Sequence, residues 1–103
     1  MEMGTPFTLA KWLVKPGQEE AFVEAWKRLG KHFYSLPQPP GPGTLLRSTT
    51  DPRLFYSFGS WPSAEAVAAM RAHPRTGEVM GKVTALCEEA TPGGYTVVAV
   101  VGE

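Results

Sequence analysis

Segments that interrupt helices and strands are the feature that most limits the possible folds of this chain. Lys15-Pro16-Gly17, Leu36 to Gly43, Thr50-Asp51-Pro52 and Pro92-Gly93-Gly94 all carry proline, glycine or turn-forming residues. The longest of these, LPQPPGPG, holds four prolines and two glycines in eight residues and predicts a connecting loop. Because such residues end helices and interrupt strands, the chain can form only short elements.

The composition fits one domain spanning residues 1–103. Hydrophobic residues make up 43% of the chain, and ten Lys plus Arg balance ten Asp plus Glu. This balance argues against nucleic acid or an anionic membrane surface as a partner. No apolar stretch approaches the roughly 20 residues that cross a bilayer. The single cysteine, Cys87, cannot form an internal disulfide, so we expect a cytoplasmic protein.

The first half of the chain predicts a strand and a helix. Phe7 to Val14 (FTLAKWLV) is rich in aromatic and branched residues and is strand-sized. From Gln18 to about Ser35, apolar residues recur at spacings of three and four, which places them on one helix face. These residues are Phe22, Ala25, Trp26, Leu29 and Phe33.

The second half predicts a hairpin, two helical pieces and a last strand. Thr44 to Thr49 and Arg53 to Trp61 are strand-like on either side of a turn that Asp51 favours. Ser63 and Thr76 are candidate helix caps. The expected remaining elements are a helix from Ser63 to Ala72, a helix from Thr76 to about Ala90 that buries Val79, Val83, Leu86 and Cys87, and a strand from Tyr95 to Val101 after a turn at Pro92 to Gly94.

This order of elements predicts an α+β fold. The order is strand, helix, two strands, a helix in two pieces, and a last strand. This is the split βαβ plan of the ferredoxin-like plait, which has a four-stranded antiparallel sheet with its helices on one side.

Apolar residues on both faces of the strands predict a partner. Leu54, Tyr56 and Phe58 share one face of the third strand, while Phe55 and Trp61 lie on the other. The helices can cover one face only. About six exposed apolar side chains would cost on the order of 10 kcal/mol, so we expect a homodimer.

Two segments of the chain resemble the antibiotic biosynthesis monooxygenase family, a branch of the dimeric α+β barrel proteins. They are Val14 to Trp26 (VKPGQEEAFVEAW) and Leu54 to Met70 (LFYSFGSWPSAEAVAAM). In that family a Lys-Pro-Gly turn opens the first helix, and a Trp ends the third strand before a capped helix rich in Glu and Ala.

The resemblance implies a barrel of two face-to-face sheets, with a pocket between sheet and helices in each subunit. Members of known activity oxidise phenols, quinols or polyketide aromatics with O₂, often without metal or flavin. A substrate that loses a proton there reduces oxygen itself, while the protein supplies desolvation, orientation and proton transfer.

The chain departs from the family pattern at several positions. Trp61 matches the family Trp. Many quinol-oxidising members carry two histidines where this chain has Met70 and Arg75. The haem-degrading branch needs an Asn and a later His, which this chain lacks, so we do not expect haem degradation.

Few residues are candidates for chemistry. His73 is either a cap at a helix end or the best general base. His32, near the end of the first helix, is expected to be solvated or to face the helix dipole. The two histidines lie on separate elements without a ligand spacing, so neither a metal nor another cofactor is expected.

The candidates for substrate binding are one cation and several aromatic residues. Arg47 is either a surface charge or the cation for an anionic ligand. Aromatic residues form either an ordinary core or the walls of a pocket, among them Trp26, Tyr56, Phe58 and Trp61.

Two functions remain open. The first is a cofactor-independent monooxygenase for a small aromatic, phenol or quinol-like molecule, in which Trp61 shapes the pocket, Arg47 steadies a phenolate and His73 moves protons. The second is a non-catalytic ligand-binding or assembly domain with the same barrel. A cavity above roughly 300 Å³ with Arg47 or His73 facing it would favour the enzyme.

Overall fold

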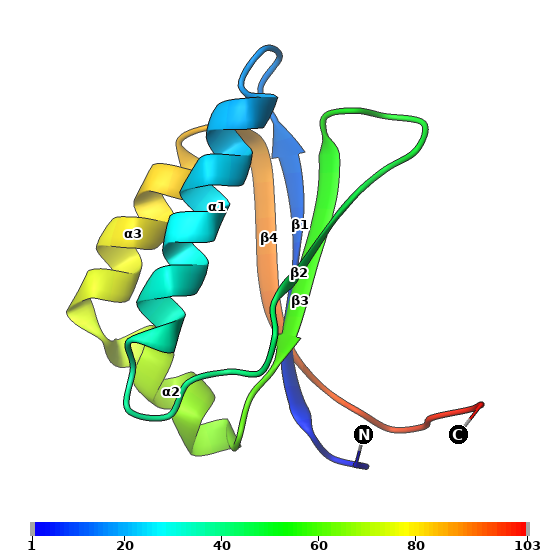
Figure 1. Cartoon of the computed structure of the whole chain (residues 1–103), viewed down its shortest axis with the longest axis vertical. Coiled ribbons are helices and arrows are strands. Elements are labelled where there is room, and N and C mark those ends of the chain that lie inside the picture. Colours follow the sequence, from blue (N-terminus) through cyan, green and yellow to red (C-terminus); the bar gives the residue numbers. More distant parts are fainter. Residues whose placement is uncertain (1, 103) are drawn as a thin grey trace.

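The computed structural model describes residues 2–102 as one sheet covered on one face by helices (Figure 1). The sheet has four strands in the order β2-β3-β1-β4, and all neighbouring strands are antiparallel. This is the predicted ferredoxin-like α+β plait. The elements are β1 (Pro6–Val14), α1 (Glu19–Tyr34), β2 (Thr44–Arg47), β3 (Leu54–Ser60), α2 (Ala64–Ala72), α3 (Pro74–Thr84) and β4 (Cys87–Thr96).

The first four elements lie where the sequence predicts them. Helix α1 buries Phe22, Ala25 and Leu29 toward the sheet, as its apolar spacing requires. Strands β2 and β3 form the predicted hairpin. In its turn, the backbone N–H of Arg53 donates to Oδ1 of Asp51 over 3.0 Å, which confirms Asp51 as a turn residue.

The helical segment after β3 begins as predicted, but its second piece does not. The hydroxyl of Ser63 accepts a hydrogen bond from the backbone N–H of Ala66 and caps α2. Helix α3, however, begins at Pro74 with His73 as its cap and not at Thr76, and it ends at Thr84 and not near Ala90. Proline suits the first turn because its missing N–H would find no partner there.

The predicted position of the last strand was wrong. Cys87, expected on a helix, begins β4, and Pro92-Gly93-Gly94 lies inside this strand and forms no turn. The segment from Tyr95 to Val101 is mostly an arm beyond the sheet, in which Val98 and Val101 are 78% and 97% exposed. Pairing along the nine residues of β1 overrides the local turn signal, and β4 is an edge strand, where proline is tolerated.

The core lies between the helices and the inner face of the sheet. Trp12, Phe22 and Phe55 meet at its centre, with ring centroids 5.6 Å and 4.9 Å apart in successive pairs. The outer face of the sheet is open in the single chain (Figure 1). There Leu54 and Phe58 are half-buried and Tyr56 is 40% exposed, so the expected burial of both faces does not occur within one chain.

None of the helices in the described part of the chain is long and apolar enough to cross a membrane.

Candidate functional site

A cavity of about 610 Å³ lies between the inner face of the sheet and the helices. Its floor consists of small side chains on three neighbouring strands. In the register, Ala10 of β1 stands between Ser57 of β3 and Pro92 of β4, and Thr8 stands beside Gly59. Because none of these residues carries a large side chain, the sheet leaves room under the helices that bulkier residues would fill.

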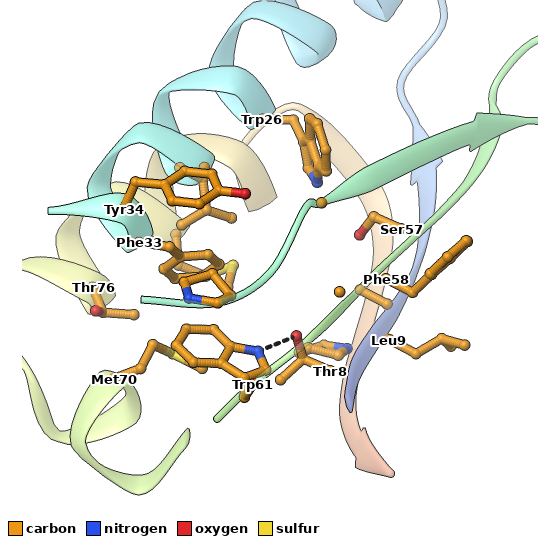
Figure 2. Close-up of a pocket in the computed structure, with 18 of the residues that line it drawn as sticks. Thr8, Leu9, Trp26, Phe33, Tyr34, Ser57, Phe58, Trp61, Met70 and Thr76 are labelled. Carbon is orange, nitrogen blue, oxygen red and sulfur yellow. Dashed lines mark hydrogen bonds between the residues drawn. The ribbon is translucent and has the colours of Figure 1, made fainter. Parts of the chain in front are cut away.

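The walls of the cavity are mainly aromatic (Figure 2). Helix α1 contributes Trp26 and, about two turns further along, Phe33 and Tyr34. Two methionines, Met70 of α2 and Met80 of α3, complete the apolar lining. A lining of this kind excludes water and suits a flat apolar molecule.

Trp61 closes the end of the cavity that lies nearest α2. It is 3% exposed, and its indole N–H donates to the hydroxyl of Thr8 over 3.0 Å (Figure 2). The ring of Phe33 meets it edge-on, with centroids 5.3 Å apart and an interplanar angle of 69°. The hydrogen bond and the edge-on contact together fix the orientation of this wall.

The proline-rich loop forms the rim of the cavity. Residues 40–43 line it. The hydroxyl of Tyr34 donates to the carbonyl of Gly41 over 2.8 Å, and the Gly41 N–H donates to the carbonyl of Ser60 over 2.8 Å. A Cβ atom on Gly41 would lie 2.5 Å from the hydroxyl of Ser60, so a larger residue at position 41 would require the Ser60 side chain to rotate away. The loop is the predicted connection between helix and strand.

The cavity contains polar groups that can bind a ligand, among them Ser57 and Trp26. The hydroxyl of Ser57 accepts from the indole N–H of Trp12 over 2.9 Å, which leaves its own hydrogen available to donate. The indole N–H of Trp26 makes no hydrogen bond within residues 2–102, and its nitrogen lies at the cavity end of the ring (Figure 2). Both groups can donate to a phenol or carbonyl oxygen.

The charged groups at the cavity are all cationic. Lys27, Lys31 and Arg71 are among the lining residues, whereas Asp, Glu and His are absent from them. The guanidinium of Arg71 rests against β4, where a Cβ atom on Gly94 would lie 3.1 Å from Nη2. Lys27 is paired with Glu24 over 3.4 Å, so Lys31 and Arg71 provide the positive charge that favours an anionic or easily ionised ligand.

The structure brings some of the predicted site residues together and separates others. Trp26 and Trp61 line the cavity. Phe58 borders it, but its side chain points away from it (Figure 2). Tyr56 is on the outer face of the sheet, because side chains along a strand alternate between the two faces and Tyr56 alternates with the inward-facing Ser57. It pairs there with Leu46 of β2 and Lys11 of β1.

Arg47 lies outside the cavity. It is exposed, and its guanidinium carbon is 5.0 Å from the ring centroid of Phe55 at the β2 edge of the sheet. This contact is a cation–π interaction that holds the side chain against the core. In a single chain, Arg71 takes the position at the cavity that Arg47 was expected to fill.

His73 also lies outside the cavity and is exposed. Its Nδ1 accepts a hydrogen bond from the backbone N–H of Arg75 over 3.1 Å, so the side chain caps the start of α3. A capping role was one of the two expectations, although at the end of α2 and not at the start of α3. The imidazole is not placed to take a proton from a molecule in the cavity.

His32 is the residue that the sequence placed least well. It was expected to be solvated or to face the helix dipole; it does lie in the last turn of α1, but it is 7% exposed, and its Nε2 lies 2.7 Å from the hydroxyl of Thr76. Burial lowers its pKa, and the neighbouring His73 and Arg75 lower it further. Its place beside the apolar stripe of α1 was a visible signal of this burial.

The described residues include no cluster of three or more His, Cys, Asp or Glu side chains that could hold a metal ion.

Solved structures share this fold over nearly the whole chain. A variant of SnoaB from Streptomyces nogalater, described as a cofactor-independent oxygenase, is 19% identical, covers 97% of this chain and 99% of its own, and has a TM-score of 0.86. A conserved protein from Methanosarcina mazei is 14% identical over 92% of this chain and 94% of its own, with a TM-score of 0.79. A third structure, an antibiotic biosynthesis monooxygenase, is 17% identical over 92% and 98%, with a TM-score of 0.72.

Comparison by sequence gives no match, either to a protein-family model or to a curated protein. The structural likeness confirms the predicted fold and the resemblance to antibiotic biosynthesis monooxygenase-like proteins in architecture. At these identities it does not assign an activity.

Proposed function

We propose that this chain is a cofactor-independent monooxygenase that acts on a small aromatic molecule of the phenol or quinol class. The observation that carries this proposal is the cavity, which combines aromatic walls, a floor of small residues and cations without carboxylates. Its volume of about 610 Å³ exceeds what a flat aromatic molecule of one to three rings needs. The shared fold with SnoaB agrees with this assignment.

The lining residues would favour the ionised form of a phenol. The rings of Trp26, Phe33 and Trp61 would displace water from the faces of a bound aromatic molecule, which would strengthen its electrostatic contacts with the cavity. A phenolate oxygen would accept hydrogen bonds from the Ser57 hydroxyl or the Trp26 indole N–H, with Arg71 nearby as a counter-charge. These contacts lower the pKa of a bound phenol, so that the molecule becomes a better electron donor.

The reaction balances without a resident cofactor. A phenol and O₂ give a quinone and water: one oxygen atom becomes the new carbonyl, the other leaves as water, and the four electrons come from the substrate. The role proposed for the protein is to hold the electron-rich anion and O₂ together in a dry space.

We further propose that two copies of the chain pack sheet to sheet through the open outer face. Leu46 and Tyr56 form an adjacent pair there that is 51% and 40% exposed, and the C-terminal arm adds the exposed valines. Apolar side chains at this density are typical of an interface between subunits.

A binding domain without catalysis is the second candidate. It is favoured by the cavity lining, which offers neither an imidazole nor a carboxylate to remove a proton. An enzyme was expected to have a cavity with Arg47 or His73 facing into it. The cavity is present, but both residues lie outside it.

Oxygen consumption with a panel of benzo- and naphthohydroquinones separates the two candidates. We expect protein-dependent uptake that falls in Trp61→Ala and Trp26→Phe and that persists in Tyr95→Phe, an exposed aromatic outside the cavity. Saturable binding of the same compounds without uptake above the uncatalysed rate would assign the chain to the second candidate. Absence of both binding and uptake would contradict both.

A further inference from the structure

Some of the positively charged side chains of this chain have an interaction partner, and others do not. Lys and Arg number ten. Within residues 2–102, six of them contact a carboxylate, a carbonyl, an aromatic ring or the backbone, namely Lys11, Lys15, Lys27, Arg47, Arg53 and Arg71. The remaining four make no such contact in this part of the chain, and they are Arg28, Lys31, Arg75 and Lys82.

These four residues, which we call the basic cluster, line one groove. The groove has a volume of about 530 Å³ and lies between α1 and α3; of its lining residues, Lys31 also lines the aromatic cavity. Its lining contains the whole cluster together with His32 and Ser35, and it contains no Asp or Glu. In a chain with zero formal charge, four exposed cations around one hollow give the groove a local positive potential that attracts anions.

The two helices set the spacing of the charges. They run in opposite directions side by side (Figure 1), and the contact between His32 and Thr76 fixes the end of α1 beside the start of α3. Arg75 therefore lies at the His32 end of the groove. Lys82 is seven residues further along α3, at the Arg28 end, which is about 10 Å away at 1.5 Å per residue.

His32 gives a second and independent indication of a ligand. It is a lining residue of the groove, it is 7% exposed, and its Nδ1 is buried without a hydrogen-bond partner in the described structure. A buried ring nitrogen without a partner costs free energy. An anion in the groove would supply the missing charge partner to the imidazolium form.

We propose that the basic cluster binds a small molecule that carries two separated phosphate groups. Guanidinium groups match phosphate oxygens in a two-pronged geometry, and Arg28 and Arg75 lie at opposite ends of the groove. A bisphosphate spans the two ends, whereas a monophosphate occupies only one. This site shares Lys31 with the proposed oxygenase site, but Arg28 and Arg75, on which the proposal depends, line the groove alone.

The test compares a hexose 1,6-bisphosphate with the corresponding hexose 6-phosphate by calorimetric titration at fixed ionic strength. We expect the bisphosphate to bind about tenfold more tightly, since it gains a second charge-assisted contact. Arg28→Gln should bring its affinity down to that of the monophosphate. Lys11→Gln, which removes the same charge outside the groove, should change the affinity by less than about twofold.

The pKa of His32, measured by NMR titration, provides a second test. Anion binding to other surface charges would leave this pKa unchanged. We expect the bisphosphate to raise the pKa of His32 in the parent protein and to do so less in Arg75→Gln. Equal affinity for the two sugars, equal losses in Arg28→Gln and Lys11→Gln, or an unchanged His32 titration would each overturn the proposal.

Discussion

The indole N–H of Trp61 donates to the hydroxyl of Thr8, so the residue after β3 is tied to the central strand of the sheet. This bond orients the wall of the aromatic cavity and is buried with it.

Removing the acceptor should therefore cost more stability when the donor is present than when it is absent. We expect Thr8→Val to lower the free energy of unfolding by about 1–3 kcal/mol, because it leaves a buried N–H without a partner. In Trp61→Phe the same Thr8→Val change should cost much less. Urea denaturation of the four proteins in a double-mutant cycle measures the coupling, and additive effects would contradict it.

Filling the floor of the cavity should remove binding without removing the fold. Ala10 lies under the aromatic walls, so Ala10→Leu would place a branched side chain where a ligand would lie. We expect the affinity for aromatic ligands, measured by tryptophan fluorescence, to fall at least about tenfold, while the far-ultraviolet circular dichroism stays unchanged. Val98→Leu, on the exposed arm, is the control. Unchanged affinity would show that ligands bind elsewhere.

His73 should behave as a cap and not as a base. We expect His73→Ala to lower the free energy of unfolding by about 0.5–2 kcal/mol, because the N–H of Arg75 loses its acceptor. His73→Asn should restore most of this stability. Oxygen uptake, where it occurs, should persist in both variants once they are folded. Loss of uptake in His73→Asn with normal stability would restore the catalytic assignment.

The burial of His32 predicts a dependence of stability on pH. Its pKa is lowered in the folded chain, so the unfolded chain binds more protons at mildly acidic pH. The free energy of unfolding should therefore fall as pH drops below about 6.5, the ordinary histidine value, and level off below the folded pKa. In His32→Gln this part of the pH dependence should disappear. Thermal unfolding across this pH range measures it, and an identical profile in the variant would contradict the assignment.

The outer face of the sheet should hold two chains together. Tyr56 and Leu46 stand side by side at its surface, so Tyr56→Lys combined with Leu46→Lys places two like charges in the proposed interface. We expect the parent protein to sediment as a dimer and the double variant as a monomer of lower stability. Lys substitutions at two exposed helix positions, Glu20 and Glu65, should leave the dimer intact. A monomeric parent protein at micromolar concentration would contradict this interface.

The sequence predicts best the elements whose pattern is local. Helix α1 carries its own apolar stripe and charge order, so its bounds follow from residues 18–35 alone. The bounds of β4 do not follow from its own residues. Pro92-Gly93-Gly94 has the composition of a turn and becomes part of a strand only because it pairs with β1. The misplacement of β4 also moved Cys87 from a strand to a helix.

The site was harder to predict than the fold. The cavity depends on which small residues become neighbours, and Ala10, Ser57 and Pro92 come together only through the register of three strands. Trp61 was predicted because it matches the Trp of the family that the chain resembles, and Trp26 was predicted only as one of several aromatic residues that could form a core or a pocket wall. Arg71 was missed because its place at the cavity depends on how α2 meets β4, which one-dimensional spacing does not contain.

Pro92 has a further consequence for how copies of this chain can meet. Edge strands with free N–H groups invite strand-by-strand addition and growth into fibrils. Pro92 occupies the middle of β4 and has no N–H to offer, so ladder extension from that side is interrupted. We therefore expect the β4 edge to resist the strand-by-strand growth that forms open-ended polymers.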